Sequence, residues 1–310
     1  AIGGQWGGAM LLVTESAPKD QRGWYGAYAQ AGAPVGVILA NLAFLGVSAS
    51  LSEADFMDWG WRLPFIASFV LILISMYVQL KLEDTPAFKA LAANQAPKDA
   101  VQQTVVKSPV IEVLRRYPKR IVLAAGAFLS IQVTFYILIA FVVAYGVNSP
   151  TVTLSRDMML TAVLVAAAIM VPSQFYFSGL SDRLGRKTVY RWGAILTGLW
   201  GFALFPLIDT GQPVLICFAV TMGLVFLGMQ YGPQAAFFTE LFSTEVRYSG
   251  ASLGYQLGAI VGGALAPTIA VLLWNNFGIF WVSVYIALAA ILTLISLSQL
   301  TETQGSDLME

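Results

Sequence analysis

A nine-residue run between two apolar segments places one carboxylate among three cations. Its notable members are Gly179, Asp182, Arg183, Gly185, Arg186 and Lys187. The glycines permit a tight turn with close backbone approach, and the charges can form ion pairs between the ends of neighbouring helices. Because exposed ion pairs are individually weak, this chemistry suits contacts that form in one conformation and break in another.

Two acidic-then-basic pairs stand at the ends of other apolar segments. They are Glu15 with Arg22 and Glu240 with Arg247. We expect Asp182, Glu240 and Arg247 to form an ion-pair cluster that ties helix ends together when one side of the protein is closed. Such a cluster would bias an equilibrium between two conformations. The alternative is that these charges only set the orientation of the chain in a membrane.

Several polar or amphipathic side chains fall inside otherwise apolar segments. Those of greatest interest are Gln5, Trp6, Gln132, Tyr136, Gln230 and Tyr231. An amide that faces lipid lacks a hydrogen-bond partner, so these groups should face the protein interior or a water-filled cavity. We expect them to contact a small polar substrate, since an amide both donates and accepts hydrogen bonds without a fixed charge. The alternative, hydrogen bonding between helices, stays open for each residue.

The composition argues against several other classes of protein. The chain has no His and one Cys, Cys217, which excludes disulfides within the chain and Cys–His or Ser–His catalysis. No acid pair or metal-ligand set lies within the apolar segments, so we expect neither an enzyme nor a bound metal or cofactor. The 17 basic and 17 acidic residues balance, which gives no reason to expect nucleic acid as a partner.

Hydrophobic residues make up 57% of the 310 residues and charged residues 11%, which is too little charge for a water-soluble surface. A membrane-spanning helix needs about 20 mostly apolar residues. The sequence holds nine candidate spans, the first of them short, at residues 1–17, 23–47, 60–82, 119–147, 157–180, 187–208, 212–239, 248–274 and 277–300.

The basic residues predict how these spans are oriented. Residues 83–118 form the one long polar connection between spans. If this linker is cytoplasmic, 15 of the 17 Lys and Arg residues fall on the cytoplasmic side, leaving only Arg62 and Arg156 outside. Cytoplasmic loops carry such an excess of Lys and Arg. We therefore expect the linker and the tail at 301–310 to be cytoplasmic.

An internal repeat relates residues 4–36 to residues 229–262, and both copies have the same expected membrane orientation. A weaker echo relates residues 83–85 to 301–303. The clearest matches set Gln5 with Gln230, Glu15 with Glu240 and Arg22 with Arg247. Parallel repeats are typical of transporters built from two halves. The fourth to sixth spans lack partners, so we expect three more helices before Ala1 in a twelve-helix protein, of which this sequence is an N-terminally truncated part.

Four glycines recur every fourth residue on one span: Gly250, Gly254, Gly258 and Gly262. Such a stripe lets a neighbouring helix backbone approach closely. Gly32 and Gly36 partly echo the stripe in the related span, so we expect the two spans to have matching packing faces.

These motifs resemble those of the major facilitator superfamily. The run 179–187 is similar to the family's loop signature, which lies on the cytoplasmic side between the second and third helices of each half. The Glu15–Arg22 and Glu240–Arg247 pairs resemble the family's acidic-then-basic pairs. Residues 3–9, 59–65 and 83–88 resemble the metabolite:proton symporter branch, which includes transporters for shikimate, α-ketoglutarate, citrate and proline/betaine. The chain departs from many members of this branch at Gln5, where they have Glu.

The resemblance implies an all-α integral membrane protein with the major facilitator fold and about nine of twelve transmembrane helices. It implies four regions: the remainder of the N-terminal half at 1–82, a cytoplasmic linker at 83–118, a six-helix half at 119–300 and a cytoplasmic tail at 301–310.

The function implied by the resemblance is secondary active transport of a small polar metabolite, an organic acid or a zwitterion, by alternating access with coupling to protons. The signature run and the two acidic–basic pairs would form the gate. The expected partners are the substrate, the proton and the lipid bilayer, for a monomer in the bacterial inner membrane. A facilitator-fold sensor without transport and an exporter of drugs or metabolites are the alternatives.

Overall fold

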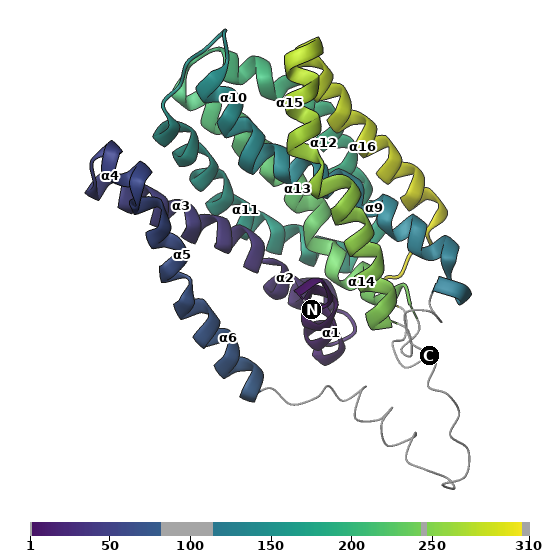
Figure 1. Ribbon diagram of the computed structural model, residues 1–310. Coiled ribbons are helices and arrows are strands. Elements are labelled where there is room, and N and C mark those ends of the chain that lie inside the picture. Colours follow the sequence, from purple (N-terminus) through teal and green to yellow (C-terminus); the bar gives the residue numbers. More distant parts are fainter. Residues whose placement is uncertain (1, 82–113, 243–246, 306–310) are drawn as a thin grey trace, which may run out of the picture.

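The computed structural model describes residues 2–81, 114–242 and 247–305, and it is helical almost throughout that part of the chain (Figure 1). An N-terminal block contains α1 (Ile2–Ser16), α2 (Arg22–Gln30), α3 (Gly32–Ser50), α4 (Glu53–Asp58), η1 (Gly60–Arg62), α5 (Leu63–Ala67) and α6 (Phe69–Lys81). A C-terminal block contains α9 (Pro118–Tyr136), η2 (Ile137–Phe141), α10 (Val142–Asn148), α11 (Arg156–Leu184), α12 (Arg186–Asp209), α13 (Pro213–Glu240), α14 (Arg247–Gly258), η3 (Ala259–Ala264), α15 (Ala266–Phe277) and α16 (Phe280–Gln299).

Among the described residues, eight helical stretches are long and apolar enough to cross a membrane. They cover residues 22–50, 60–78, 118–148, 156–184, 186–209, 213–240, 247–277 and 280–299. The first predicted span corresponds to α1, whose 15 residues make it shorter than these eight. The all-α membrane fold predicted from the sequence is thereby confirmed. Most of the predicted linker 83–118 and half of the tail 301–310 lie outside the described residues.

Prolines and a glycine set several helix ends. Pro118 and Pro213 stand in the first turns of α9 and α13, where a missing N–H costs no helical hydrogen bond. α11 ends at Leu184 and is followed by Gly185, whose φ of 98° is readily adopted only by glycine. This turn leads directly into α12 and fixes the corner on which the predicted signature run lies.

Two spans of the C-terminal block contain a turn of π-helix, which the sequence did not predict. η2 separates α9 from α10, and η3 separates α14 from α15. η3 packs against α9. π-turns interrupt the regular ladder of backbone hydrogen bonds and occur frequently at functional sites. Both turns border the face of α9 that carries Gln132 and Tyr136.

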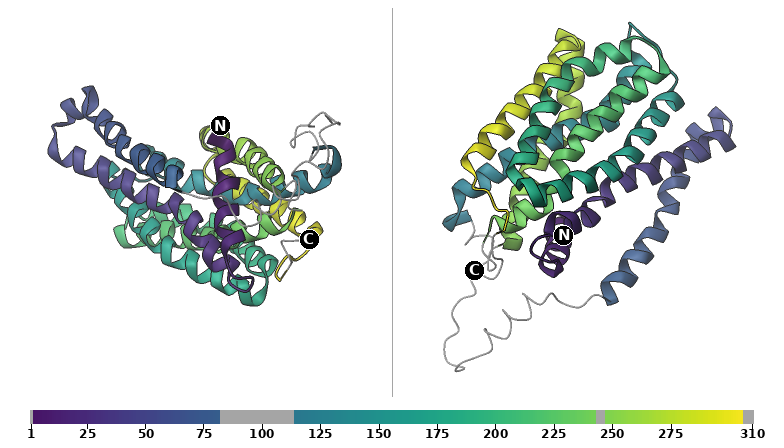
Figure 2. Two further views of the ribbon diagram at one scale, coloured as in Figure 1. Left: turned by 90° about the horizontal axis from the view of Figure 1, so that it is seen from below. Right: turned by 180° about the vertical axis from the view of Figure 1, so that it is seen from behind.

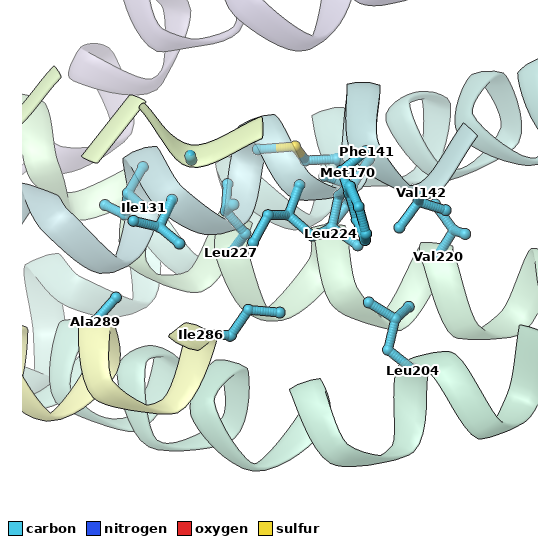
Figure 3. Close-up of a cluster of buried hydrophobic side chains, with 14 of the residues drawn as sticks. Ile131, Phe141, Val142, Met170, Leu204, Val220, Leu224, Leu227, Ile286 and Ala289 are labelled. Atoms are coloured by element: carbon cyan, nitrogen blue, oxygen red, sulfur yellow. The ribbon is translucent and has the colours of Figure 1, made fainter. Parts of the chain in front are cut away.

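The apolar core of the C-terminal block lies among α9, α11, α12, α13 and α16 (Figure 3). Ile131, Met170, Leu224 and Ile286 converge there, and each is at most 2% exposed. Close packing of this kind makes the block rigid, so its helices hold their polar side chains in fixed positions.

The N-terminal block touches the C-terminal block through α1, α2 and α3, whereas α6 lies away from it (Figures 1 and 2). The glycine stripe packs as predicted: a Cβ added at Gly254 would lie 2.7 Å from the Ala124 Cβ, and one at Gly258 would lie 2.5 Å from the Phe128 Cβ. By contrast, Gly32 and Gly36 have no described atom within 4 Å of an added Cβ, so the expected matching face makes no such contact.

Candidate functional site

Asp182 lies in the last turn of α11, where a carboxylate meets the unfavourable negative end of the helix dipole. Its oxygens accept hydrogen bonds from the backbone N–H groups of Gly23 at 2.8 Å and Trp24 at 2.9 Å. Both donors belong to the first turn of α2, which has no side-chain cap of its own. Asp182 therefore caps a helix of the other block, and this contact exists only while the blocks are together.

Arg186 joins Asp182 to Glu240. Its guanidinium lies 2.5 Å from Asp182 Oδ1 and 3.4 Å from Glu240 Oε1, and it also donates to the Ser181 hydroxyl at 3.0 Å. The side chains of Arg186 and Glu240 are 1% and 0% exposed. Charges buried this deeply are stable only when they are paired and hydrogen-bonded, so these groups depend on one another.

Two further ion pairs cross between the blocks. Arg247 Nη1 lies 3.1 Å from Glu15 Oε1, and Arg22 Nη1 lies 4.0 Å from Glu240 Oε1. The acidic and basic partners thus come from different copies of the repeat. The sequence predicts that Arg247 joins Asp182 and Glu240, whereas the structure pairs it with Glu15. We call the following set the ionic cluster: Glu15, Arg22, Asp182, Arg186, Glu240 and Arg247.

The other residues of the run 179–187 lie at the edge of the ionic cluster. A Cβ added at Gly179 would lie 3.3 Å from the Trp24 ring, so α11 approaches α2 closely there. Arg183 is exposed, and no hydrogen bond or ion pair joins it to a described residue. The Lys187 ammonium donates to the Leu300 carbonyl. The run therefore contributes Asp182 and Arg186 to the cluster itself.

Glu302, which follows α16, holds the start of α12. Its carboxylate accepts hydrogen bonds from the backbone N–H groups of Arg186 at 2.9 Å and Lys187 at 3.0 Å. The sequence motifs do not assign Glu302 to the site. The signal was present in the echo between residues 83–85 and 301–303, which places an acidic residue shortly after the last span of each half.

The two residues after Glu302 reach the ionic cluster directly. The Thr303 hydroxyl donates to Glu240 Oε2 at 2.8 Å. The Gln304 side chain donates to the backbone carbonyl of Asp182. The segment after α16 thus connects the end of the last span to the Glu240 carboxylate and to the backbone of Asp182.

The two blocks approach closely at two glycines, where an added Cβ would meet atoms of the other block. A Cβ added to Gly23 would lie 2.7 Å from the Ser178 carbonyl oxygen and 2.9 Å from Asp182 Oδ1. A Cβ added to Gly7 of α1 would overlap the Ser252 hydroxyl of α14. Backbone atoms of one block thus rest directly on atoms of the other.

A second polar contact between the blocks lies about 10 Å farther along α2, at its last residue, Gln30. The Gln30 Oε1 accepts a hydrogen bond from Trp6 Nε1 at 3.1 Å. Its Nε2 donates to the Tyr231 carbonyl at 3.0 Å and to Gln234 Oε1 at 2.9 Å. Gln30 is 0% exposed, so its amide is satisfied entirely by partners on α1 and α13.

Aromatic rings extend this contact toward α9. Trp6 stacks on Tyr255 with ring centroids 4.6 Å apart. Tyr255 in turn packs edge to face against Phe128 of α9, with ring centroids 5.3 Å apart. A Cβ added at Gly263 would lie 2.8 Å from the Tyr136 ring and 3.3 Å from Gln132 Oε1. We call this set the polar layer: Trp6, Gln30, Gln132, Tyr136, Tyr231, Gln234 and Tyr255.

Two predicted substrate-facing residues are not part of the polar layer. Gln230 is 0% exposed, packs against Gly193 and donates to the Thr197 hydroxyl at 2.7 Å. The structure therefore places its side chain in the packing between α12 and α13. The side chain of Gln5 lies outside the described part of the structure.

The sequence profile of the Major Facilitator Superfamily matches residues 1–255. The chain belongs to the major facilitator superfamily. It is therefore a multi-pass membrane protein of a family of secondary transporters, and its resemblance to that family in the run 179–187 is confirmed.

Relatives of this facilitator carry transport names. The inner membrane metabolite transport protein YhjE of Escherichia coli is 38% identical, and the match covers 99% of this chain and 69% of YhjE. The shikimate transporter of E. coli is 34% identical over 94% of this chain and 65% of that protein. These relatives are transporters rather than enzymes.

Solved structures share the facilitator fold. The sugar-bound proton:xylose symporter XylE matches with a TM-score of 0.72 and 15% identity, over 97% of this chain and 69% of XylE. An inward-open structure of XylE from E. coli matches less well, with a TM-score of 0.61 and 18% identity, over 97% of this chain and 67% of that one. At sequence identities of 15% and 18%, the similarity to these XylE structures shows the fold alone.

Proposed function

We propose that this facilitator carries a small polar metabolite, an organic acid or a zwitterion, by alternating access coupled to protons. The observation that carries the proposal is the ionic cluster, in which charged groups of one block are satisfied by groups of the other. A contact that needs both blocks at one end of the bundle can exist in only one of two rocking conformations. It therefore biases the equilibrium between them.

Opening this end would remove specific interactions. Asp182 would lose the N–H groups of Gly23 and Trp24, and Arg247 would lose Glu15. Removing one partner of an ion pair that stays buried costs about 3–5 kcal/mol. In the open conformation water replaces the lost partners, so the free-energy difference between the closed and open conformations is smaller than this cost. The cluster can thus hold the closed state without making it permanent.

We assign the closed end to the cytoplasmic side of the inner membrane. The distribution of charge supports this assignment. Of the 17 Lys and Arg residues, 15 lie in the linker or at helix ends on the same side of the predicted membrane, and such residues favour the cytoplasm. A reporter that fluoresces only in the cytoplasm, fused after Glu310, should therefore be bright.

We propose that the polar layer borders the substrate path. Its amide and hydroxyl groups offer hydrogen bonds, while the stacked rings of Trp6 and Tyr255 offer an apolar wall. Tyr136 is 38% exposed and so is open to a solute. Gln230 is outside this path in the closed conformation, because α12 and α13 enclose it.

Uptake into liposomes that contain the complete protein tests the proposed function. A proton gradient, acidic outside, should drive accumulation of at least one of shikimate, α-ketoglutarate, citrate, proline or glycine betaine, and a protonophore should abolish that accumulation. Uptake that only equilibrates, whatever the gradient, would contradict proton coupling. Saturable binding of one of these solutes without any uptake would favour the sensor alternative instead.

A further inference from the structure

A cavity lies between the two blocks at the end away from the ionic cluster. It has a volume of about 310 Å³ and is bounded by α3 and α4 on one side and by the start of α11 on the other. α4 lies at the end of the bundle away from α1 (Figure 1). A volume of this size falls at the lower end of the range for small-molecule sites.

Three charged side chains line this cavity. Arg156 and Asp157 come from the first turn of α11, and Glu53 comes from the first turn of α4. No hydrogen bond or ion pair joins these three side chains to described residues. The cavity therefore presents one cation and two carboxylates that neutralise neither each other nor their surroundings.

The rest of the lining adds an apolar floor to these charges. The Arg156 guanidinium carbon lies 5.9 Å from the centre of the Phe56 ring, a cation–π contact that orients the side chain across the two blocks. Phe44 and Ser48 of α3 complete that wall. The Arg156 backbone also begins α11, so the positive end of a long helix adds to the guanidinium charge.

We propose that this cavity binds a zwitterion that carries a primary ammonium group and an anionic group a few atoms apart. The anionic group pairs with Arg156, and the ammonium group donates hydrogen bonds to Glu53 and Asp157. A purely anionic ligand would meet the two carboxylates, and a purely cationic ligand would meet Arg156. Two sources supply such a ligand: a free solute, or the headgroup of phosphatidylethanolamine in the surrounding bilayer.

Labelling of a cysteine in the cavity measures occupancy directly. Cys217→Ala removes the natural thiol, and Ser48→Cys places one in the lining. The complete protein is placed in nanodiscs, and the rate of maleimide labelling is followed. In the first arm, the labelling rate in phosphatidylcholine nanodiscs is compared with and without γ-aminobutyrate, which tests the free solute. In the second arm, the labelling rate in phosphatidylethanolamine nanodiscs is compared with that in phosphatidylcholine nanodiscs, both without solute, which tests the lipid headgroup.

Slowing of labelling by at least fivefold in either arm is the expected result, and the arm that responds identifies the source. Arg156→Gln and Glu53→Gln should each abolish the slowing, whereas Arg62→Gln, which removes a cation outside the cavity, should leave it intact. Ethylammonium and propionate, which carry one charge each, should slow labelling far less than γ-aminobutyrate.

The proposal is overturned if neither arm slows labelling. It is also overturned if slowing persists unchanged in both Arg156→Gln and Glu53→Gln, because protection would then arise without the charges. The two variants lie on different blocks, so failure of one to fold leaves the other to decide.

Discussion

At the scale of single residues, Glu15 and Arg247 make the simplest contact between the blocks. Their ion pair is direct, at 3.1 Å, and both side chains are less than a tenth exposed. A pair that is shielded from water in this way has more effect on a conformational equilibrium than an exposed pair, since neither partner is well solvated when the other is removed.

Exchange of these two charges tests the pair. Glu15→Arg alone should lower initial uptake at least tenfold, because two cations would then face each other. Adding Arg247→Glu should restore a substantial part of the activity, since the attraction is re-formed in reverse. Uptake and the amount of protein in the membrane are measured for Glu15→Arg, for Arg247→Glu and for the variant that carries both substitutions. A double variant no better than the worse single would show that the pair does not couple the blocks.

Asp182 and Arg183 are neighbours in the sequence with different surroundings, which provides a matched comparison. Asp182→Asn weakens the cap on α2 and the pair with Arg186, so we expect initial uptake to fall about tenfold or more with membrane insertion unchanged. Arg183→Gln alters an exposed side chain and should change uptake less than twofold. Equal effects of the two substitutions would indicate that this run only sets membrane orientation.

Gly23 tests the close approach of the blocks without altering any charge. Ala is a better helix former than Gly, so Gly23→Ala should not weaken α2 itself. Its Cβ would meet the Ser178 carbonyl and Asp182, so it should prevent closure and lower uptake at least tenfold. Gly32→Ala, where no described atom lies within 4 Å of the added Cβ, is the control. Similar uptake by the two variants would contradict the closed geometry.

At the scale of elements, the sequence predicted each apolar helix to within four residues at either end. Hydropathy is sufficient for this because backbone hydrogen bonds must be satisfied within a helix that crosses lipid. The π-turns at 137–141 and 259–264 were not predictable, since their residues are as apolar as those around them. η3 packs against α9, a contact between distant segments that no local pattern encodes.

The candidate site was predictable in part. The charged groups were identified from their motifs, but their partners were not, because the pairing of Glu15 with Arg247 depends on how two distant segments meet. Gln230 resembled a substrate-facing amide by its place in the repeat. Its actual neighbours, Thr197 and Gly193, depend on the register between α12 and α13.

Glu302 offers a test at the scale of one helix end. Glu302→Gln weakens two hydrogen bonds to the first N–H groups of α12, and the loss of a cap costs about 0.5–2 kcal/mol. We expect a lower midpoint of thermal unfolding and lower uptake. Thr301→Ala, which alters an exposed neighbour, should leave both unchanged. If the two variants behave alike, Glu302 does not support the corner that holds Arg186.

At the scale of the whole molecule, the proposed alternating access requires the two blocks to close and open at the end where the ionic cluster and the polar layer join them. A free-energy change of about 1.4 kcal/mol shifts the ratio of two conformations tenfold. Loss of one good hydrogen bond to a charged group is of that size. Single substitutions in the cluster should therefore redistribute the two conformations measurably without unfolding the protein.

The most direct test is a distance distribution between spin labels on the two blocks at this end. Asp20→Cys, between α1 and α2, and Thr188→Cys, in α12, are exposed positions, and Cys217→Ala removes the natural thiol. The complete protein should show a short and a long population, with the short one dominant. Asp182→Asn should raise the ratio of long to short about tenfold, whereas Arg183→Gln should leave it unchanged. An identical distribution in the parent and Asp182→Asn would contradict the claim that the ionic cluster holds this end closed.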